Sequence, residues 1–274
     1  MKQYYLLINP KGGHKKGFEI FEKVKHVFDN SNIKLKVLHT EYAGHAFDLA
    51  NSLDFSNYDG LCAIGGDGTM YEMINGMLKR KDNQKIPIGL ITGGTGNSFM
   101  YDVECLDPVE AAKRIVQHKL RPLDIAKVDA NGETFYAFNI IGWGLATDAG
   151  KLAEKLRLFG GMRYDIASVI EVLKGKDRFA KLKIENEVIN DNFIFVIGCN
   201  TIHTGKAMKM APIAKLDDGK IDLLIVRKTS RVNLLKLFPK LFSGDHIKSP
   251  LVEYRQVENF SISIEETNDL TIDG

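Results

Sequence analysis

The stretch Leu61-Cys62-Ala63-Ile64-Gly65-Gly66-Asp67-Gly68-Thr69 joins an apolar segment to a glycine-rich turn that carries one carboxylate. Apolar residues repeat at helical spacing directly behind it, at Met70, Met73, Ile74, Met77 and Leu78. The stretch therefore predicts a strand that turns tightly into a helix. Thr69 and Glu72 have the spacing of a capping box at the start of that helix. Glycines and a helix N-terminus together favour an anion, so the turn predicts a phosphate site.

Asp67 is the unusual member of this turn, because a carboxylate repels phosphate. It fits phosphate chemistry if it holds a metal ion, or if it takes the proton from a hydroxyl that attacks the phosphate. The alternative is a structural turn in which Asp67 only hydrogen-bonds to nearby backbone. This stretch alone leaves both interpretations open.

The first half of the chain alternates between strand and helix patterns. Strands are expected over residues 4–8, 34–39, 59–64 and 86–91, and a last helix near 107–117. Such alternation predicts a parallel sheet whose ligands bind beyond the carboxyl ends of the strands. Glycine-rich turns follow three of these ends, at Asn9-Pro10-Lys11-Gly12-Gly13, at Gly65 to Thr69, and at Gly93-Gly94-Thr95-Gly96-Asn97. Three such turns on one edge predict a shared phosphate or nucleotide site.

The second half is dominated by strand patterns. Strands are expected over residues 123–130, 134–141, 180–185, 192–198, 221–226 and 260–264. Turn residues such as Asn131-Gly132 connect neighbouring strands, which indicates a mostly antiparallel sheet. The predicted architecture is an α/β domain over residues 1–122 and a β-rich domain over residues 123–274, with the boundary near Arg121-Pro122.

Composition restricts the class of protein. A hydrophobic content of 44% and a charged content of 26% fit a soluble globular chain, and a net charge of +2 gives no argument for binding nucleic acid. The sequence contains no apolar run of about 18 residues and no signal-peptide pattern at its start, so a cytoplasmic location is expected. The three cysteines are widely spaced and predict neither a disulfide framework nor a zinc site.

Six motifs occur in an order that resembles the diacylglycerol kinase catalytic-domain family, which includes sphingosine and ceramide kinases. They are Asn9-Pro10…Gly12-Gly13, Gly65 to Thr69, Gly94-Thr95-Gly96-Asn97, Gly142-Trp143-Gly144, Leu216-Asp217-Asp218-Gly219 and Asp273-Gly274. The pentad Gly65 to Thr69 is less specific alone, since NAD kinases and phosphofructokinases carry similar turns. The resemblance implies an NAD kinase/diacylglycerol kinase-like fold and transfer of the γ-phosphate of ATP to a lipid hydroxyl, with Mg²⁺.

The resemblance also implies roles for individual residues. Asp67 is the candidate base or part of the magnesium network, and Asp273 is a second candidate catalytic carboxylate. Asp218 resembles the carboxylate of a structural magnesium site completed by backbone carbonyls, for which Lys215 and Lys220 are candidates, although Asp-Asp-Gly is also a common turn. Nucleotide-binding roles are implied for Asn9, Gly12, Gly13, Thr40, Gly65, Gly66, Gly68, Thr69, Glu72, Thr95, Gly96, Asn97, Arg157 and Arg163.

Two of these assignments involve neighbouring residues. Thr40 belongs to a Thr-Glu…His-Ala pattern that ends at His45-Ala46. Arg157 and Arg163 resemble arginines that reach the ATP phosphates, and Gly160-Gly161 between them is expected to break a helix and let them converge. Their alternative interpretation is two solvated arginines on helix surfaces.

The lipid class depends on one position. In sphingosine kinases an acid pairs with the amine of the substrate, and its counterpart in this sequence is Gly150. This departure favours a neutral lipid such as diacylglycerol, although Asp148 leaves a carboxylate two residues earlier. A sphingoid-base or ceramide kinase, an NAD kinase-like enzyme and a non-catalytic nucleotide- or lipid-binding protein remain alternatives.

Two further features have consequences for partners and activity. Residues 232–242 combine apolar side chains with Arg231, Lys236 and Lys240 beside them, which fits a helix packed on the core or one docked transiently on anionic membrane. A peripheral membrane location and a homodimer are therefore open. In the family, the motif at Asp273-Gly274 is followed by a Glu and closing strands, so the end of this sequence is a departure on which activity depends.

Overall fold

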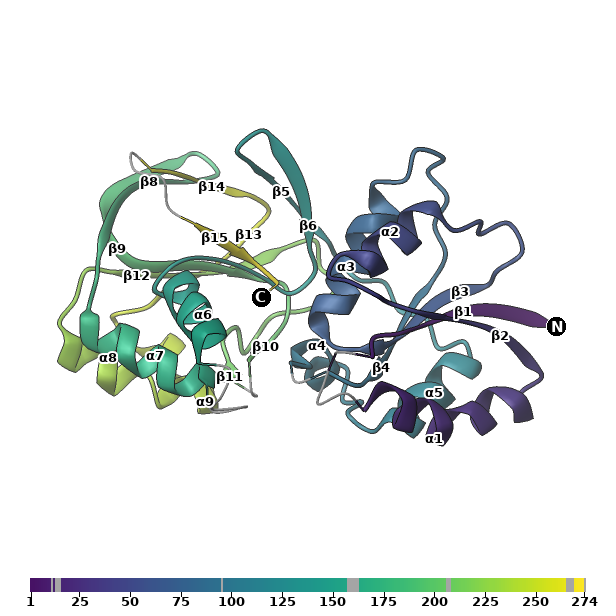
Figure 1. Cartoon of the computed structure of the whole chain (residues 1–274). Coiled ribbons are helices and arrows are strands. Elements are labelled where there is room, and N and C mark those ends of the chain that lie inside the picture. The colour runs from purple at the N-terminus through teal and green to yellow at the C-terminus, as the bar shows by residue number, and fades with distance from the viewer. Residues whose placement is uncertain are drawn as a thin grey trace. The chain divides into compact units, whose positions relative to one another are not determined.

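The computed structural model describes residues 1–10, 12, 16–94, 96–156, 163–205, 208–264 and 269–273, and for residues 163–165 the backbone alone. The chain divides into two compact units (Figure 1). The first comprises Met1–Pro122 and Lys127–Tyr136, and the second comprises Leu123–Ala126 and Ala137–Gly274.

A four-stranded parallel sheet forms the centre of the first unit. Its order is β2-β1-β3-β4, formed by β1 (Lys2–Ile8), β2 (Ile33–His39), β3 (Gly60–Gly65) and β4 (Ile88–Thr92). The central strand β3 is buried along its whole length, as expected of a parallel strand covered on both faces. The edge strand β2 instead exposes Lys34 and Lys36, which oppose edge-to-edge pairing with another chain.

Helices cover both faces of this sheet. Figure 1 shows α1 (Gly17–Asn30) and α5 (Pro108–Val116) on one face and α2 (His45–Ser52) and α3 (Asp67–Leu78) on the other. The short helix α4 (Ser98–Asp102) follows the turn after β4. A hairpin of β5 (Ala126–Ala130) and β6 (Glu133–Ala137) completes the unit. The predicted α/β fold class is confirmed for this part of the chain.

The side chain of Asn75 fastens that hairpin to α3. Its Nδ2 donates to the carbonyl oxygen of Tyr136 (2.8 Å), and its Oδ1 accepts from the N–H of the same residue (2.9 Å). The amide thus pairs with the hairpin as a neighbouring strand would. Lys79, one turn further along α3, lies 5.1 Å from the ring centroid of Phe135.

The second unit is built on a seven-stranded sheet whose pairings are antiparallel, which confirms the predicted β-rich half. The path β13-β12-β9-β7-β15 is extended by β8, which pairs with β9 and with β14. The strands are β7 (Ile140–Gly144), β8 (Arg178–Ile184), β9 (Glu187–Cys199), β12 (Ile221–Arg227), β13 (Glu253–Val257), β14 (Phe260–Ser263) and β15 (Leu270–Ile272). The remaining elements are the short strands β10 (His203–Thr204) and β11 (Met208–Lys209), the helices α6 (Leu145–Lys155), α7 (Arg163–Lys174), α8 (Arg231–Leu237) and α9 (Lys240–Ser243), and the 3₁₀ helix η3 (Asp245–Lys248).

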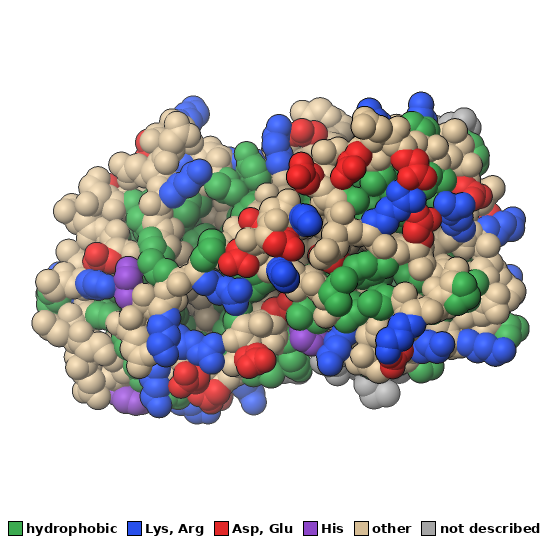
Figure 2. Space-filling view, turned by 180° about the vertical axis from the view of Figure 1, so that it is seen from behind, with side chains coloured by type: hydrophobic (Ala, Val, Ile, Leu, Met, Phe, Trp, Pro, Cys, Tyr) green, Lys and Arg blue, Asp and Glu red, His purple; other side chains and the backbone are tan. Residues whose placement is uncertain are grey.

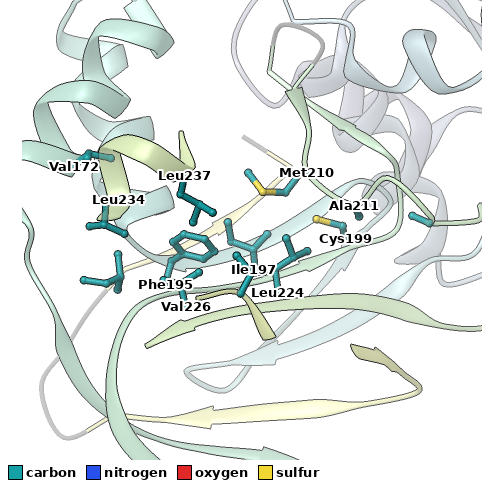
Figure 3. Packing of buried hydrophobic residues seen from close by; sticks show 13 residues of the cluster. Val172, Phe195, Ile197, Cys199, Met210, Ala211, Leu224, Val226, Leu234 and Leu237 are labelled. Atoms are coloured by element: carbon teal, nitrogen blue, oxygen red, sulfur yellow. The ribbon is translucent and has the colours of Figure 1, made fainter. Parts of the chain in front are cut away.

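Two hydrophobic clusters sandwich the central strands of this sheet. Along β12, Leu223 and Ile225 belong to one cluster, whereas Leu224 and Val226 belong to the other. This alternation follows from the two-residue period of a strand. The cluster that contains Leu224 and Val226 also contains Val172 of α7 and Leu237 of α8 (Figure 3). Burial on both faces explains why these strands read as continuous apolar runs in the sequence.

Three local predictions are wrong. The expected strand over residues 134–141 is two strands, β6 and β7, because the backbone at Phe138 and Asn139 donates to the carboxylate of Asp273. The expected continuous helix over residues 232–242 is two helices, separated at Pro239. The expected capping box is absent, since α3 begins at Asp67 with Gly66 as its N-cap and no side-chain cap.

Among the described residues, no helix has the length and apolar content needed to cross a bilayer.

Candidate functional site

The turns after β1, β3 and β4 meet at one edge of the parallel sheet. The N–H of Asn9 donates to the carbonyl oxygen of Ile64 (3.2 Å), and the N–H of Gly93 donates to that of Gly65 (2.8 Å). These bonds continue the strand pairing into the turns. The three glycine-rich segments that the sequence predicted to share an edge therefore lie side by side in the residues that the structure describes.

Glycine is required where two of these turns touch. A Cβ on Gly66 would lie 2.5 Å from the carbonyl oxygen of Gly96, and a Cβ on Gly94 would lie 2.5 Å from the Cα of Gly66. A Cβ on Gly65 would lie 2.6 Å from the hydroxyl of Thr69. Gly66 and Gly94 thus pack backbone against backbone, and Gly65 packs against the side chain of Thr69, so contacts inside the protein require all three glycines.

At Gly68 and Gly96, no close contact with the described residues requires a glycine. A Cβ on Gly68 would meet nothing within 4 Å, and a Cβ on Gly96 would meet only Asp67 Oδ2, at 3.8 Å. Gly68 lies in the first turn of α3, where amides lack intrahelical acceptors, and its N–H has no acceptor among the described residues. These two positions leave backbone open to a ligand, and the positive end of the helix dipole favours an anion there.

Asp67 is buried at the start of α3, with 8% of its surface exposed. Its Oδ2 accepts from the N–H of Ser98 (2.7 Å) and its Oδ1 from that of Phe99 (3.3 Å), so it holds the N-terminus of α4. Burial raises the pKa of Asp67, and the hydrogen bonds from Ser98 and Phe99 oppose that rise. The carboxylate is fixed in place and more basic than an exposed aspartate.

Asn97 presents an unsatisfied acceptor in the same region. Its Nδ2 donates to the carbonyl oxygen of Gly94 (2.9 Å), while its buried Oδ1 has no hydrogen-bond partner among the residues described. A buried acceptor without a donor is costly, so a ligand or water that donates to it would stabilise the turn.

A cavity of about 230 Å³ opens beside this edge within the first unit. Five of the predicted nucleotide-binding residues line it: Asn9, Gly12, Thr40, Thr69 and Glu72. Glu41 and Ala46, from the Thr-Glu…His-Ala pattern, also line it. Tyr42 and Ala43 complete the lining and were missed, because their only signal was their position inside that pattern.

Glu72 connects the cavity wall to α2 rather than to its own helix. Its carboxylate accepts from the N–H of Gly44 (2.9 Å) and from that of Ala46 (3.1 Å). Gly44 is the N-cap of α2 and has a φ of 89°, which favours glycine. Glu72 therefore caps α2 and holds the segment that carries Thr40 and Tyr42.

One residue that lines the cavity, Tyr42, is aromatic. The ring of Tyr42 stacks on His45 at 4.5 Å, and its hydroxyl donates to Asp48 Oδ2 (2.8 Å), which raises the pKa of Tyr42. The N–H of Glu41 donates to His45 Nδ1 (3.0 Å), so that nitrogen is an acceptor. Tyr42 is 52% exposed, which leaves ring surface free to pack against a flat ligand.

Asp273 is engaged with backbone in the second unit. Its Oδ2 accepts from the N–H of Phe138 (2.9 Å), and its Oδ1 accepts from Asn139 (2.9 Å) and Ile140 (2.8 Å). Its own N–H donates to the carbonyl oxygen of Ile140 (2.9 Å). This arrangement positions the start of β7, and the predicted catalytic role of Asp273 stays a prediction.

The predicted metal residues lie in a turn before β12. Asp218 Oδ1 accepts from the N–H of Lys220 (3.1 Å), and Gly219 has a φ of 71°, as in many Asp-Gly turns. The N–H of Gly219 also donates to Asp124 Oδ2 (2.6 Å). Among the described residues, no group of three or more His, Cys, Asp and Glu side chains is placed to hold a metal. Asp218 with carbonyls of Lys215 and Lys220 stays a prediction.

Four predicted residues contribute no side-chain geometry. Gly13, Thr95 and Arg157 lie outside the described residues, and Arg163 begins α7 with only its backbone described.

Profiles of two protein families match the chain. The diacylglycerol kinase catalytic domain matches residues 3–128, and the YegS C-terminal NAD kinase beta sandwich-like domain matches residues 139–274. Residues 3–128 therefore belong to the diacylglycerol kinase catalytic-domain family. The similarity of the chain to solved structures covers both units: a crystal structure of a diacylglycerol kinase from Bacillus anthracis aligns with a TM-score of 0.80 and 25% identity, over 100% of this chain and 90% of that one.

Curated relatives of the chain carry two kinds of name. Sphingosine kinase 1 of Arabidopsis thaliana is 29% identical over 94% of this chain and 64% of its own length. Diacylglycerol kinase of Bacillus subtilis is 27% identical over 100% of this chain and 90% of its own length. The chain thus spans somewhat less than two thirds of the plant relative.

Proposed function

We propose that the chain is an ATP-dependent lipid kinase that transfers the γ-phosphate to the hydroxyl of a neutral lipid such as diacylglycerol. The observation that supports this most strongly is the start of α3, where a buried carboxylate, Asp67, adjoins open glycine backbone at Gly68 and Gly96. Family membership supports the reaction class.

The residues of the first unit fit ATP. Among the described residues, the N–H of Gly68 at a helix N-terminus has no acceptor and is open to a phosphate, and the buried Oδ1 of Asn97 has no donor. The cavity beside Tyr42 offers a surface for a base or a sugar. Asn9 holds the turn at Gly12 by accepting its N–H on Oδ1 (2.9 Å). A bound Mg²⁺ would neutralise charge on the phosphates, and Asp67 is the carboxylate of this edge that suits it.

Asp67 has the properties of a proton acceptor for the attacking hydroxyl. Its burial raises the pKa of its carboxyl group above the ordinary value, which increases basicity, and its two hydrogen bonds to α4 fix its orientation. Phosphoryl transfer asks the protein mainly to position the reactants and to stabilise charge. The same carboxylate can hold a metal ion. Substitution of Asp67 by Asn keeps the shape of the side chain and removes its charge.

A neutral acceptor is favoured by α6. At Gly150, where the resemblance places the acid of sphingosine kinases, there is no carboxylate. The nearby carboxylate of Asp148 accepts from Arg178 Nη2 (2.6 Å), and both side chains are largely shielded from solvent. A paired carboxylate is poorly available to a substrate ammonium.

The decisive experiment supplies the purified chain with Mg²⁺, γ-labelled ATP and diacylglycerol, monoacylglycerol, sphingosine, ceramide or NAD. We expect label in diacylglycerol. Label in sphingosine would support the second candidate, a sphingoid-base kinase, which the names of the plant relatives favour. Label in NAD alone, or ATP binding without transfer to any acceptor, would overturn the lipid kinase.

Gly150→Asp tests the lipid class directly. A Cβ at Gly150 meets nothing within 4 Å, so the new side chain has room. We expect the ratio of sphingosine to diacylglycerol turnover to rise about ten-fold, the worth of one charge-assisted contact of about 1.4 kcal/mol. Gly150→Asn is the matched control, because it adds similar volume without charge. An equal rise with Asn would count against an ammonium contact.

Asp67→Asn tests the chemistry. It preserves shape but removes charge and basicity, so we expect turnover to fall about 100- to 10,000-fold. The affinity for ATP should change little. Asp29→Asn, at an exposed position of α1, is the control. Turnover that matches the wild-type protein would remove Asp67 from the reaction.

Two finer expectations complete the proposal. A lipid acceptor resides in a bilayer, so we propose peripheral membrane association.

Asp218 with the carbonyls of Lys215 and Lys220 is proposed as a structural magnesium site. We expect Mg²⁺ to raise the thermal stability of the protein, and Asp218→Asn to remove that effect.

A further inference from the structure

The segment Arg231–Ser243 has two chemically different faces. Leu234 and Leu237 are 3% and 5% exposed and pack in the cluster that contains Val172 and Phe195 (Figure 3). Val232, Leu235 and Phe242 are 59%, 39% and 43% exposed. The apolar content of the segment therefore serves the core only in part, and large apolar side chains remain on its outer face.

Cations flank those exposed apolar side chains. Arg231, Lys236 and Lys240 are exposed, and the segment contains no Asp or Glu. We call Arg231, Val232, Leu235, Lys236, Lys240 and Phe242 the outer face of α8 and α9. Three exposed cations and three exposed apolar side chains within one short segment are the composition of an interfacial segment.

The carboxylates that flank this segment are paired with other lysines. Asp177 pairs with Lys228 (3.2 Å), and Asp245 pairs with Lys248 (2.7 Å). Among the described residues, none of the three cations of the outer face forms an ion pair. Figure 2 shows acidic and basic side chains interspersed over one face of the molecule. Asp245 also lies near enough to Lys240 for the two charges to attract, so the positive charge of the outer face is compensated in part at Lys240.

We infer that the outer face of α8 and α9 docks on an anionic lipid surface. This inference rests on the proposed function, because a lipid acceptor lies in a bilayer that the protein must reach. The cations complement anionic headgroups, and Val232, Leu235 and Phe242 enter the boundary between headgroups and acyl chains. Each cation near such a surface contributes about five-fold to binding, so the three together contribute on the order of 100-fold.

Vesicle co-sedimentation tests the inference without any turnover. The full chain is mixed with vesicles of phosphatidylcholine alone or of phosphatidylcholine with phosphatidylserine. We expect binding to the anionic vesicles that weakens with added salt, and much weaker binding to the neutral ones. The triple variant R231Q/K236Q/K240Q should lose about 100-fold in partitioning, and Leu235→Ser with Phe242→Ser should also lose binding.

Matched variants on β8 separate this face from general charge and apolarity. Lys181 and Lys183 are exposed cations, and Phe179 is 50% exposed. Lys181→Gln with Lys183→Gln, and separately Phe179→Ser, should leave vesicle binding unchanged. Circular dichroism and thermal unfolding are the measurements that check that each variant is folded.

Several outcomes would overturn the inference. Vesicle binding by the triple variant equal to that of the wild-type protein would do so, as would equal losses in the β8 variants. A monomer–dimer equilibrium abolished by the Leu235 and Phe242 substitutions, without vesicle binding, would assign the face to a second copy of the chain.

Turnover separates this inference from the proposed function. On a short-chain diacylglycerol dispersed in water, the triple variant should match the wild-type rate, and on vesicle-embedded diacylglycerol it should be slower. Wild-type protein that binds anionic vesicles but phosphorylates no lipid would contradict the proposed function alone. Wild-type protein that phosphorylates lipid but ignores vesicle charge would contradict the docking face alone.

Discussion

Glu72 stands on α3, but its carboxylate serves α2. It accepts the N–H groups of Gly44 and Ala46, the free donors at the start of that helix. The sequence predicted a bond within its own helix because Thr69 and Glu72 have the capping-box spacing. Spacing along one helix cannot show that a second helix begins within reach of the same side chain.

Substitution of Glu72 should affect both stability and nucleotide binding. Glu72→Ala leaves two amides without their acceptor, so we expect a loss of about 1–2 kcal/mol in the free energy of unfolding, measured by urea denaturation. The affinity for ATP should fall as well, because the segment before α2 lines the cavity. Glu19→Ala, at an exposed position in the first turn of α1, is the control. Unchanged stability would show that water replaces the carboxylate.

Asp222 is a second residue whose environment the sequence did not reveal. It is fully buried in β12, and its Oδ1 accepts from the hydroxyl of Tyr254 (2.6 Å) and from Gln256 Nε2 (3.1 Å). Burial raises the pKa of Asp222 above its ordinary value of 3.8. Ionisation is therefore more costly in the folded protein than in the unfolded chain.

The sign of its effect on stability follows. Because the folded-state pKa is raised, the stability that Asp222 contributes is fully present below its ordinary pKa and is lost as the pH rises through the raised pKa. We expect the stability of the wild-type protein relative to Asp222→Asn to fall as the pH rises above 3.8, the ordinary pKa of the group. Urea denaturation across this range measures it. Asp217→Asn, at an exposed position, should show no such trend.

The end of α2 depends on one buried guanidinium from another element. Arg80 Nη1 donates to the carbonyl oxygens of Ala50 (3.0 Å) and Leu53 (2.8 Å), and its Nη2 pairs with Asp82 (2.6 Å). The group also lies 4.2 Å from the ring centroid of Phe55. These contacts satisfy carbonyls that a helix C-terminus leaves free.

Arg80→Met keeps the length of the side chain and removes its donors. We expect a loss of about 3 kcal/mol in the free energy of unfolding, because two carbonyls and Asp82 lose their partner. Lys81→Met, on the exposed neighbour, should change stability by less than about 0.5 kcal/mol. Arg80→Lys should restore only part of the loss, since one ammonium cannot reproduce the fork of the guanidinium. Chemical denaturation ranks the three, and full rescue by Lys would contradict the geometric argument.

The two faces of α8 predict opposite outcomes for two neighbouring leucines. Leu237→Ala removes a buried side chain and should cost about 2–5 kcal/mol. Leu235→Ala removes an exposed one and should cost less than about 0.5 kcal/mol. Thermal unfolding distinguishes them. Similar losses would mean that Leu235 is also covered in solution.

Elements were predictable where burial is complete on both faces. The strands β1, β3 and β12 read as apolar runs because the sheet is covered on both sides. β13 was missed because its sequence, Glu253 to Val257, is rich in polar residues that form ion pairs and hydrogen bonds. β15 was missed because it has three residues. The break between β6 and β7 depends on Asp273, which lies far along the chain.

At the scale of the whole molecule, the site was more predictable than its environment. Asn9, Gly12, Thr40, Thr69 and Glu72 lie together because parallel strands bring their carboxyl ends to one edge. Tyr42 and Ala43, which also line the cavity, carried no signal beyond their position inside the Thr-Glu…His-Ala pattern. The boundary near residue 122, the cytoplasmic location and the homodimer stay predictions. The functional roles of all the predicted site residues stay predictions as well.

The hairpin Lys127–Tyr136 belongs to the first unit although second-unit residues precede and follow it. A chain that ends at Pro122 lacks the hairpin, so both polar atoms of the Asn75 side chain lose Tyr136. We expect residues 1–136 to unfold at a higher urea concentration than residues 1–122, and Asn75→Ala to reduce that difference. Equal midpoints would show that the hairpin adds no stability.

The same hairpin limits how such a protein can exchange parts with its relatives. The chain passes between the units after Pro122, after Ala126 and after Tyr136, so neither unit is one uninterrupted stretch of gene. A single crossover near residue 122 would join α3 from one parent protein to the hairpin from another. The side chain of Asn75 would then have to pair with a hairpin backbone from a different protein. Chimeras of this family should therefore be joined after the hairpin, where one genetic junction keeps helix and hairpin from the same ancestor.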